Sequence, residues 1–236
     1  STCYSPEDAD FLDELGVPAF KFASLSVVEP TFLAHVARKG KPIILSTGMA
    51  TMDEVQNAMK AINDAGLKDV ILLQCTTDYP ARPADANLRA MATIKESTGV
   101  PVGYSDHTQT PTACVAAVAM GACVIEKHFT LDKTLPGPDQ SSSFDPKEFT
   151  ELMLLIRETE LLMGSSEKKP SAAEKENSKG MRRSIVAKMN LKKGTVLTED
   201  MIILKRPASG ISPTKIAELI GKTLTRDVAE DEMLMI

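Results

Sequence analysis

The feature that most constrains the fold is a unit that repeats up to about Gly164: a short β-branched run, a polar or glycine-containing turn, and a longer helical pattern. This alternation predicts parallel strands joined by helices. The expected strands are Ala19–Ser24, Pro42–Ser46, Val70–Cys75, Val100–Ser105 and Cys123–His128, and Ser1–Tyr4 resembles the end of one more. Helices are expected near Pro6–Leu15, Thr31–Arg38, Met52–Ala65, Asn87–Ser97, Pro111–Met120 and Pro146–Met163.

Six strand ends are therefore visible, whereas a closed (β/α)8 barrel has eight strands and more than about 200 residues. Two interpretations fit this count. One is a barrel whose N-terminal strands are missing from this chain, and the other is an open sheet of six parallel strands.

The composition changes after Gly164. Residues 165–180 are polar, charged and free of bulky apolar side chains, which is typical of a linker. Short strand-like pieces separated by Lys/Gly and Pro/Ser/Gly turns follow. The sequence thus predicts a barrel domain over residues 1–164, a linker over 165–180 and a small β-rich domain over 181–236.

Composition also excludes several classes of protein. With 27 basic and 32 acidic residues and no basic block, the chain is not expected to bind nucleic acid. No apolar stretch is long enough to span a bilayer and no signal peptide is recognisable, so we expect no membrane association and a cytoplasmic location. The four cysteines lack the spacing of a zinc site and are interpreted as buried free thiols of a reducing compartment.

The predicted strand ends are unusually polar, and most of them carry a hydroxyl or a lysine. Each of these groups can donate a hydrogen bond to an anionic oxygen, and in a barrel all the strand ends open on one face. A phosphate site is therefore expected there. The polar strand ends are Lys21 and Ser24, Ser46–Gly48, Thr76–Tyr79, Ser105–Thr108 and Glu126–His128.

Two of the three histidines, His107 and His128, follow consecutive predicted strands, beside Asp106 and Glu126. Adjacent strand ends are close enough to share one ion, so the two histidines are candidate metal ligands. The alternative is that each histidine only makes local hydrogen bonds.

Two lysines raise a different mechanism, because a buried barrel lysine can form a Schiff base with a carbonyl substrate. Side chains alternate along a strand, so Glu126 and His128 share one face and Lys127 should point away from the barrel centre. Lys21 stays eligible, either as a phosphate ligand or as an imine-forming residue.

The chain resembles the sialic acid (N-acetylneuraminate) synthase family from Ser1 to Ile236. Five segments that match the family's landmarks occur in order: Lys41–Met49, Gly103–Thr108, Glu126–Thr130, Pro136–Asp139 and Lys205–Pro207. The resemblance implies a (β/α)8 TIM barrel, N-terminally incomplete here, followed by a small β-rich SAF (antifreeze-like) domain.

The resemblance also implies a transferase that condenses phosphoenolpyruvate with N-acetylmannosamine, or a related amino sugar, to give N-acetylneuraminate and phosphate. A divalent ion, Mn²⁺ or Mg²⁺, would be held by His107 and His128, which with Glu126 are the expected catalytic residues. The residues implied to bind phosphoenolpyruvate are Thr2, Lys21, Ser24, Ser46, Thr77 and Ser105. Those implied around the amino sugar are Tyr79, Glu126, Asp139 and Arg206. Arg206 matches an arginine that one subunit inserts into the barrel of the other, which implies a domain-swapped homodimer.

The chain departs from the family pattern in three places. Leu25-Ser26 replaces a frequent Gly-Glu, and Gln74–Thr77 replaces a segment in which Thr77 is usually an amide or serine. The family's first two barrel strands have no counterpart, so we expect that this polypeptide alone does not turn over substrate. Three alternatives remain: a legionaminate or pseudaminate synthase, a Schiff-base aldolase that uses Lys21, and a non-catalytic carbohydrate-binding protein.

Overall fold

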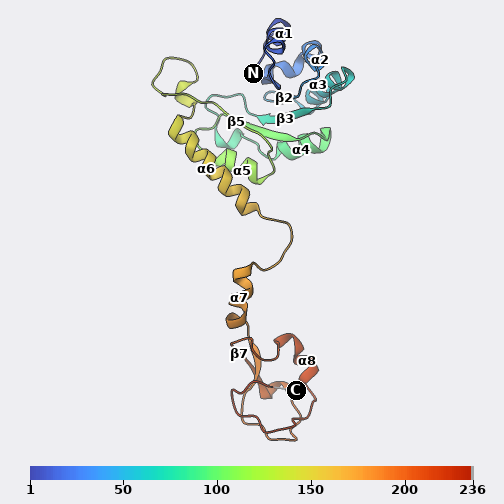
Figure 1. Ribbon diagram of the computed structural model, residues 1–236, viewed down its shortest axis with the longest axis vertical. Helices are drawn as coiled ribbons and strands as arrows, with labels where there is room; N and C mark the ends of the chain where they lie inside the picture. The colour runs from blue at the N-terminus through green and yellow to red at the C-terminus, as the bar shows by residue number, and fades with distance from the viewer. Residues whose placement is uncertain (235–236) are drawn as a thin grey trace. The chain divides into compact units, whose positions relative to one another are not determined.

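The computed structural model describes residues 1–234 and divides into two compact units, Ser1–Gly164 and Ser165–Ile236 (Figure 1). Each unit is described by itself. The last two residues of the predicted small domain, Met235 and Ile236, lie outside the described residues.

The first unit is built on a five-stranded parallel sheet whose strand order follows the chain. Its strands are β1 (Phe20–Phe22), β2 (Ile43–Ser46), β3 (Val70–Cys75), β4 (Val102–Asp106) and β5 (Ile125–Lys127). A single parallel bridge between Thr2 and Lys21 continues the sheet beyond β1. A doubly wound open sheet reverses its strand order at a switch point, whereas this order never reverses. The unit is therefore a half-barrel of the (β/α) type.

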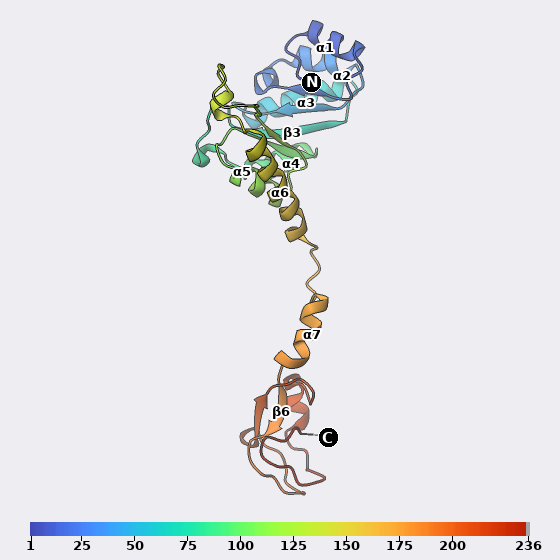
Figure 2. The same ribbon diagram turned by 60° about the vertical axis from the view of Figure 1, so that its left-hand side comes forward.

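Six helices accompany the sheet in chain order, and Figures 1 and 2 show them following its outer side. They are α1 (Pro6–Glu14), α2 (Pro30–Ala37), α3 (Met52–Asp64), α4 (Ala90–Thr98), α5 (Thr112–Ala119) and α6 (Pro146–Met163). Helices α1 to α4 pack each on the next, and α5 packs on α6. This arrangement buries both faces of the central strands, and β4 is buried at every position.

Local sequence signals set the helix starts. Ser5 caps α1 with Pro6 at the first helical position, and complete capping boxes open α3 at Thr51 and α6 at Asp145. Helix α4 ends at Gly99, whose φ of +72° is a conformation that favours glycine.

The second unit contains a two-stranded antiparallel sheet of β6 (Ser184–Ala187) and β7 (Ile202–Lys205), with the short helix α8 (Ile216–Leu219). Its small core includes Ile185, Ala187, Leu191, Leu197, Leu219, Leu224, Val228 and Leu234. Single antiparallel bridges, such as Leu191 with Val228 and Val196 with Thr223, link the remaining extended segments.

Two sequence-based expectations differ from the structure. No helix was expected in the predicted linker, but residues Ala172–Met181 form α7, which a capping box between Ser171 and Glu174 opens. Cys123 is exposed, so the prediction that all four cysteines are buried is wrong for this one. Its strand begins at Ile125, and Cys123 lies in the preceding turn. Within residues 1–234, no helix combines the length and apolar character needed to cross a bilayer.

Candidate active site

A cavity of about 420 Å³ opens at the carboxyl ends of the parallel strands. Ten of the residues proposed from the sequence line it: Thr2, Lys21, Ser24, Ser46, Tyr79, Ser105, His107, Glu126, His128 and Asp139. Two proposed residues do not. Thr77 is absent from the lining, and Arg206 belongs to the second unit.

The cavity contains a chain of polar contacts that links four strands, β1, β2, β4 and β5. The Lys21 ammonium on β1 donates a hydrogen bond to Oγ of Ser46 at 2.8 Å and lies 3.4 Å from Oε2 of Glu126 on β5. Oγ of Ser105 on β4 donates to Oε1 of Glu126 at 2.8 Å. Burial lowers the pKa of Lys21, and the neighbouring Glu126 carboxylate partly opposes that change. One cation and several hydroxyls are therefore arranged to receive an anion.

Thr77 lies next to this group although it does not line the cavity. Gly48 makes the close approach possible: a Cβ built on Gly48 would lie 2.3 Å from Oγ1 of Thr77 and 2.9 Å from Oγ of Ser24. The Gly48 amide donates to Oγ of Ser24 at 2.9 Å. The Thr77 hydroxyl therefore lies close to the Ser24 hydroxyl.

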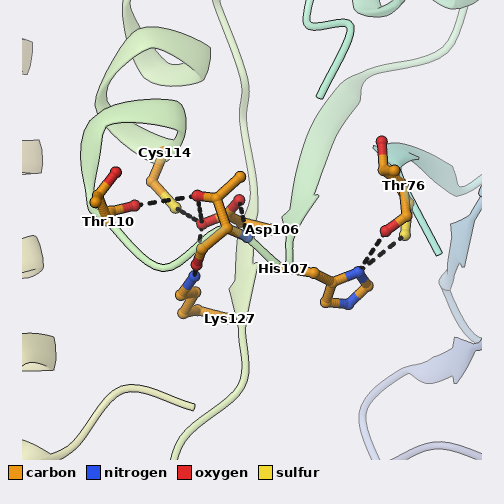
Figure 3. A network of polar contacts seen from close by, with 8 residues as sticks. Thr76, Asp106, His107, Thr110, Cys114 and Lys127 are labelled. Atoms are coloured by element: carbon orange, nitrogen blue, oxygen red, sulfur yellow. Dashed lines mark hydrogen bonds and ion pairs between the residues drawn. The ribbon is translucent and has the colours of Figure 1, made fainter. Parts of the chain in front are cut away.

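The two cavity histidines face each other. Their ring centroids are 5.1 Å apart and the ring planes meet at 76°. Nδ1 of His107 lies 2.7 Å from the Thr76 carbonyl (Figure 3). A carbonyl can only accept, so Nδ1 carries a proton, and in the neutral imidazole the lone pair is then on Nε2. Burial, helped by the neighbouring His107, lowers the pKa of His128 and favours its neutral form.

This donor set fits a divalent ion with few protein ligands. Metal-bound histidines commonly donate their second ring nitrogen to a carbonyl, as His107 does to Thr76. Oδ2 of Asp139 lies 3.8 Å from Nδ1 of His128. No group of three or more His, Cys, Asp or Glu suited to a metal occurs within residues 1–234. A bound ion would therefore take its other ligands from water or substrate, which Mg²⁺ and Mn²⁺ accept.

Tyr79 and Asp139 form the more open side of the cavity. The Tyr79 ring lies 4.2 Å from the His107 ring and 5.4 Å from the His128 ring, measured between centroids. Tyr79 is 47% exposed as a whole residue, and the side chain of Asp139 is 51% exposed. An aromatic face beside a carboxylate is well suited to a sugar, which offers both C–H groups and hydroxyls.

Lys127 contributes to the cavity wall, but its ammonium turns away from the centre, as strand alternation predicts. Its side chain is 1% exposed and pairs with Asp106 at 2.7 Å. Asp106 is thus occupied by this ion pair, does not line the cavity and cannot contact a ligand bound there.

Sequence reasoning missed three further lining residues, Tyr4, Ala23 and Cys75, and the Thr76 carbonyl. Cys75 ends β3, and alternation along that strand could have indicated its direction. A backbone carbonyl has no residue-type signature, so the sequence offered no signal for the Thr76 contact.

Comparison with known proteins shows the family to which the chain belongs. The chain matches the NeuB family over residues 1–168 and the SAF domain over residues 182–236. It is 43% identical over 236 residues to the N,N'-diacetyllegionaminic acid synthase of Campylobacter jejuni, covering 99% of this chain and 71% of that protein. It is 42% identical over 239 residues to the N,N'-diacetyllegionaminic acid synthase of Legionella pneumophila, covering 100% of this chain and 67% of that protein.

A solved structure agrees. The N-acetylneuraminic acid (sialic acid) synthetase of Leptospira borgpetersenii superposes with a TM-score of 0.70 at 36% identity, covering 75% of this chain and 61% of that one. The segment that matches the NeuB family, residues 1–168, contains the half-barrel, and the SAF match, residues 182–236, lies within the second unit. The chain belongs to the NeuB family and carries a C-terminal SAF domain.

Proposed function

We propose that the protein is a nonulosonate synthase, which condenses phosphoenolpyruvate with an N-acetylated amino sugar. One observation carries the proposal: a facing pair of imidazoles shares a cavity with a lysine, several hydroxyls and a carboxylate. The lysine and hydroxyls suit the anionic substrate, and the Tyr79 and Asp139 side suits the sugar.

In the proposed reaction, C3 of phosphoenolpyruvate attacks the aldehyde carbon of the open-chain sugar. A water molecule attacks C2, and the C2–O bond to the phosphate breaks. Lys21, Ser24, Ser46, Thr77 and Ser105 hold the anionic groups, together with Thr2. Glu126 lies next to both Lys21 and Ser105 and takes the proton that the attacking water loses. The aldehyde oxygen takes up a proton from solvent and becomes a hydroxyl, and the second proton of the added water is lost as phosphate leaves, which gives the ketone at C2.

His107 and His128 would hold a divalent ion, Mn²⁺ or Mg²⁺. Such an ion supplies a Lewis acid that polarises the aldehyde oxygen. The contact of His107 with Thr76 keeps one imidazole nitrogen free for this role. The lowered pKa of His128 keeps the second imidazole neutral near pH 7.

The proposal also concerns the identity of the sugar that accepts phosphoenolpyruvate. N-acetylmannosamine is the first choice from the sequence landmarks. Two relatives are named N,N'-diacetyllegionaminic acid synthases and are 43% and 42% identical, compared with 36% for the sialic acid synthetase. We therefore propose a 2,4-diacetamido sugar of the legionaminate type as the preferred acceptor, with N-acetylmannosamine as the competing one.

The decisive experiment supplies the full-length protein with phosphoenolpyruvate and a panel of 2-acetamido and 2,4-diacetamido sugars, and measures phosphate release with and without Mn²⁺. We expect sugar-dependent release that a chelator abolishes and Mn²⁺ restores. Release with no sugar requirement, or no release with any sugar, would contradict the proposed function.

A Schiff-base aldolase is the one competing mechanism that a specific observation favours, because burial lowers the pKa of Lys21 and so favours its nucleophilic amine form. Borohydride added during turnover would then label Lys21 covalently, and a chelator would leave turnover unchanged. We expect neither result. A purely carbohydrate-binding protein would bind the sugar without releasing phosphate.

Gly48→Ala is expected to weaken phosphoenolpyruvate binding selectively. The added methyl group meets Thr77 and Ser24 at 2.3 and 2.9 Å and must push their hydroxyls aside. A displacement of about 1 Å at such a contact can cost about a hundredfold. The KM for phosphoenolpyruvate should rise by about 10- to 100-fold, while the KM for the sugar changes little. Gly180→Ala is the control for a glycine in open space away from the cavity, and it should leave both KM values unchanged.

Arg206 enters the proposal through the resemblance to the family. Its side chain is exposed at the end of β7, and within residues 1–234 it makes no ion pair. Its neighbour Lys205, by contrast, is paired with Asp231. We propose that the Arg206 guanidinium completes the sugar side of the cavity in a second copy of this chain, within a domain-swapped homodimer.

A further inference from the structure

A buried ion pair lies directly behind the two cavity histidines. Asp106 is the last residue of β4 and Lys127 is the last residue of β5, and the strand register places them opposite each other. Nζ of Lys127 lies 2.7 Å from Oδ2 of Asp106, and the two side chains are 1% and 0% exposed. The next residue after each partner is a cavity histidine, so the ion pair joins the strand ends from which both imidazoles extend.

The Asp106 carboxylate also holds the turn after His107 in place through hydrogen bonds. It accepts a hydrogen bond from the Thr108 amide at 3.0 Å and another from the Thr108 hydroxyl at 3.1 Å. The Cys114 thiol on α5 donates to it at 3.3 Å. Figure 3 shows this cluster gathered on one side, away from the ring of His107, which points toward Thr76.

Lys127 likewise holds the segment around His128 in place. Its ammonium donates to the Thr108 carbonyl and lies 4.2 Å from the centroid of the Phe144 ring. The Phe144 amide in turn donates to the His128 carbonyl at 2.9 Å. The backbone at both histidines is therefore connected through one cluster of charged and aromatic groups.

Stability alone does not account for this pair. Removing two charges from water is costly, and apolar residues of similar volume are often as stable as a buried ion pair or more stable. Apolar residues, however, would not fix the orientation of the two strand ends, because they lack the six directional contacts that Asp106 and Lys127 make.

We propose that the Asp106–Lys127 pair is a positioning device that sets the distance and orientation of His107 relative to His128. Asp106 does not line the cavity and the Lys127 ammonium is held by Asp106, so both act through the strand ends. The inference rests on the proposed function, since it matters only if both imidazoles hold one ion.

The test is the double variant Asp106→Asn/Lys127→Met in the full-length protein. It removes both charges at nearly constant volume, so neither is left buried alone. We expect a folded protein whose Mn²⁺ affinity, measured by EPR of the free ion, is about 10- to 100-fold weaker, as found for partners that orient metal ligands. Pulsed EPR should detect weaker coupling of Mn²⁺ to imidazole nitrogen, and kcat should fall while the KM for phosphoenolpyruvate stays near the wild-type value.

Lys133→Met is the matched control. The Lys133 ammonium also lies near Phe144, at 6.0 Å from the ring centroid, and pairs with Glu148 at 2.6 Å, but it has no bond to β4. This variant should bind Mn²⁺ like the wild type. If it weakens Mn²⁺ binding as much as the double variant does, loss of any nearby charge explains the effect and the positioning role is wrong.

Should the double variant not fold, Lys127→Arg takes its place. It keeps the charge, but a planar guanidinium cannot reproduce the compact contacts of the ammonium, so we expect a measurable loss of Mn²⁺ affinity. Wild-type Mn²⁺ affinity, nitrogen coupling and kcat in a folded variant would overturn the positioning role alone. A wild-type protein that neither binds Mn²⁺ nor releases phosphate would overturn the proposed function and this inference with it.

Discussion

Replacing either His107 or His128 by alanine is expected to lower phosphate release by about a thousandfold or more, which corresponds to about 4 kcal/mol of transition-state stabilisation. Each variant would remove one of the two imidazoles that face each other at 5.1 Å, and a single remaining imidazole holds a divalent ion poorly. Both side chains border the cavity, so their truncation enlarges an open space and should leave the fold intact. Thermal unfolding and initial rates at saturating Mn²⁺ measure the two effects separately.

The third histidine supplies the control. His35 lies on α2 and pairs with Asp10 at 2.7 Å, outside the cavity lining. His35→Ala should keep wild-type turnover and wild-type Mn²⁺ dependence. Near-normal rates in a folded His107→Ala or His128→Ala protein would remove the basis of the metal mechanism. Equal losses in all three variants would point to a general effect on folding.

The face of the strand on which each site side chain lies was largely predictable, because it follows from a local rule. Alternation along a strand puts Glu126 and His128 on one face and Lys127 on the other, and no knowledge of the neighbouring strands is needed. The alternation of parallel strands and helices followed from the same kind of local signal, whereas the choice of a barrel over an open sheet came from the family resemblance. The Ser5 and Asp145 caps were also readable, and each opens a helix at the expected position.

What could not be predicted depends on register and on backbone groups. Asp106 and Lys127 were each noticeable in the sequence, but their pairing requires that β4 and β5 align with these two residues opposite, which a single sequence does not specify. The contact between His107 and the Thr76 carbonyl involves a group that every residue carries. Helix α7 was missed for a different reason: the polar composition of 165–180 outweighed the capping box at Ser171, which was visible in the sequence.

Arg206→Ala and His107→Ala are expected to complement each other when the two inactive chains are combined in one dimer. If Arg206 acts in the partner's cavity, a mixed dimer contains one cavity with an intact His107 and an intact Arg206 from the other chain. Random pairing of equal amounts makes about half of the dimers mixed, so about one quarter of all sites should be active. If Arg206 acts within its own chain, every site in the mixed dimer lacks one residue, and no activity returns.

The measurement uses co-expression of the two variants with different affinity tags, isolation of the doubly tagged dimer, and phosphate release per dimer. Arg226→Ala is the control for loss of a surface arginine from the same unit, since Arg226 is already paired with Glu232 at 2.6 Å. It should be active by itself. Full activity of the Arg206→Ala protein alone would show that the guanidinium is dispensable. A doubly tagged dimer without activity would place Arg206 beside the cavity of its own chain, because only an exchange of the SAF domain between subunits can reunite the two intact residues.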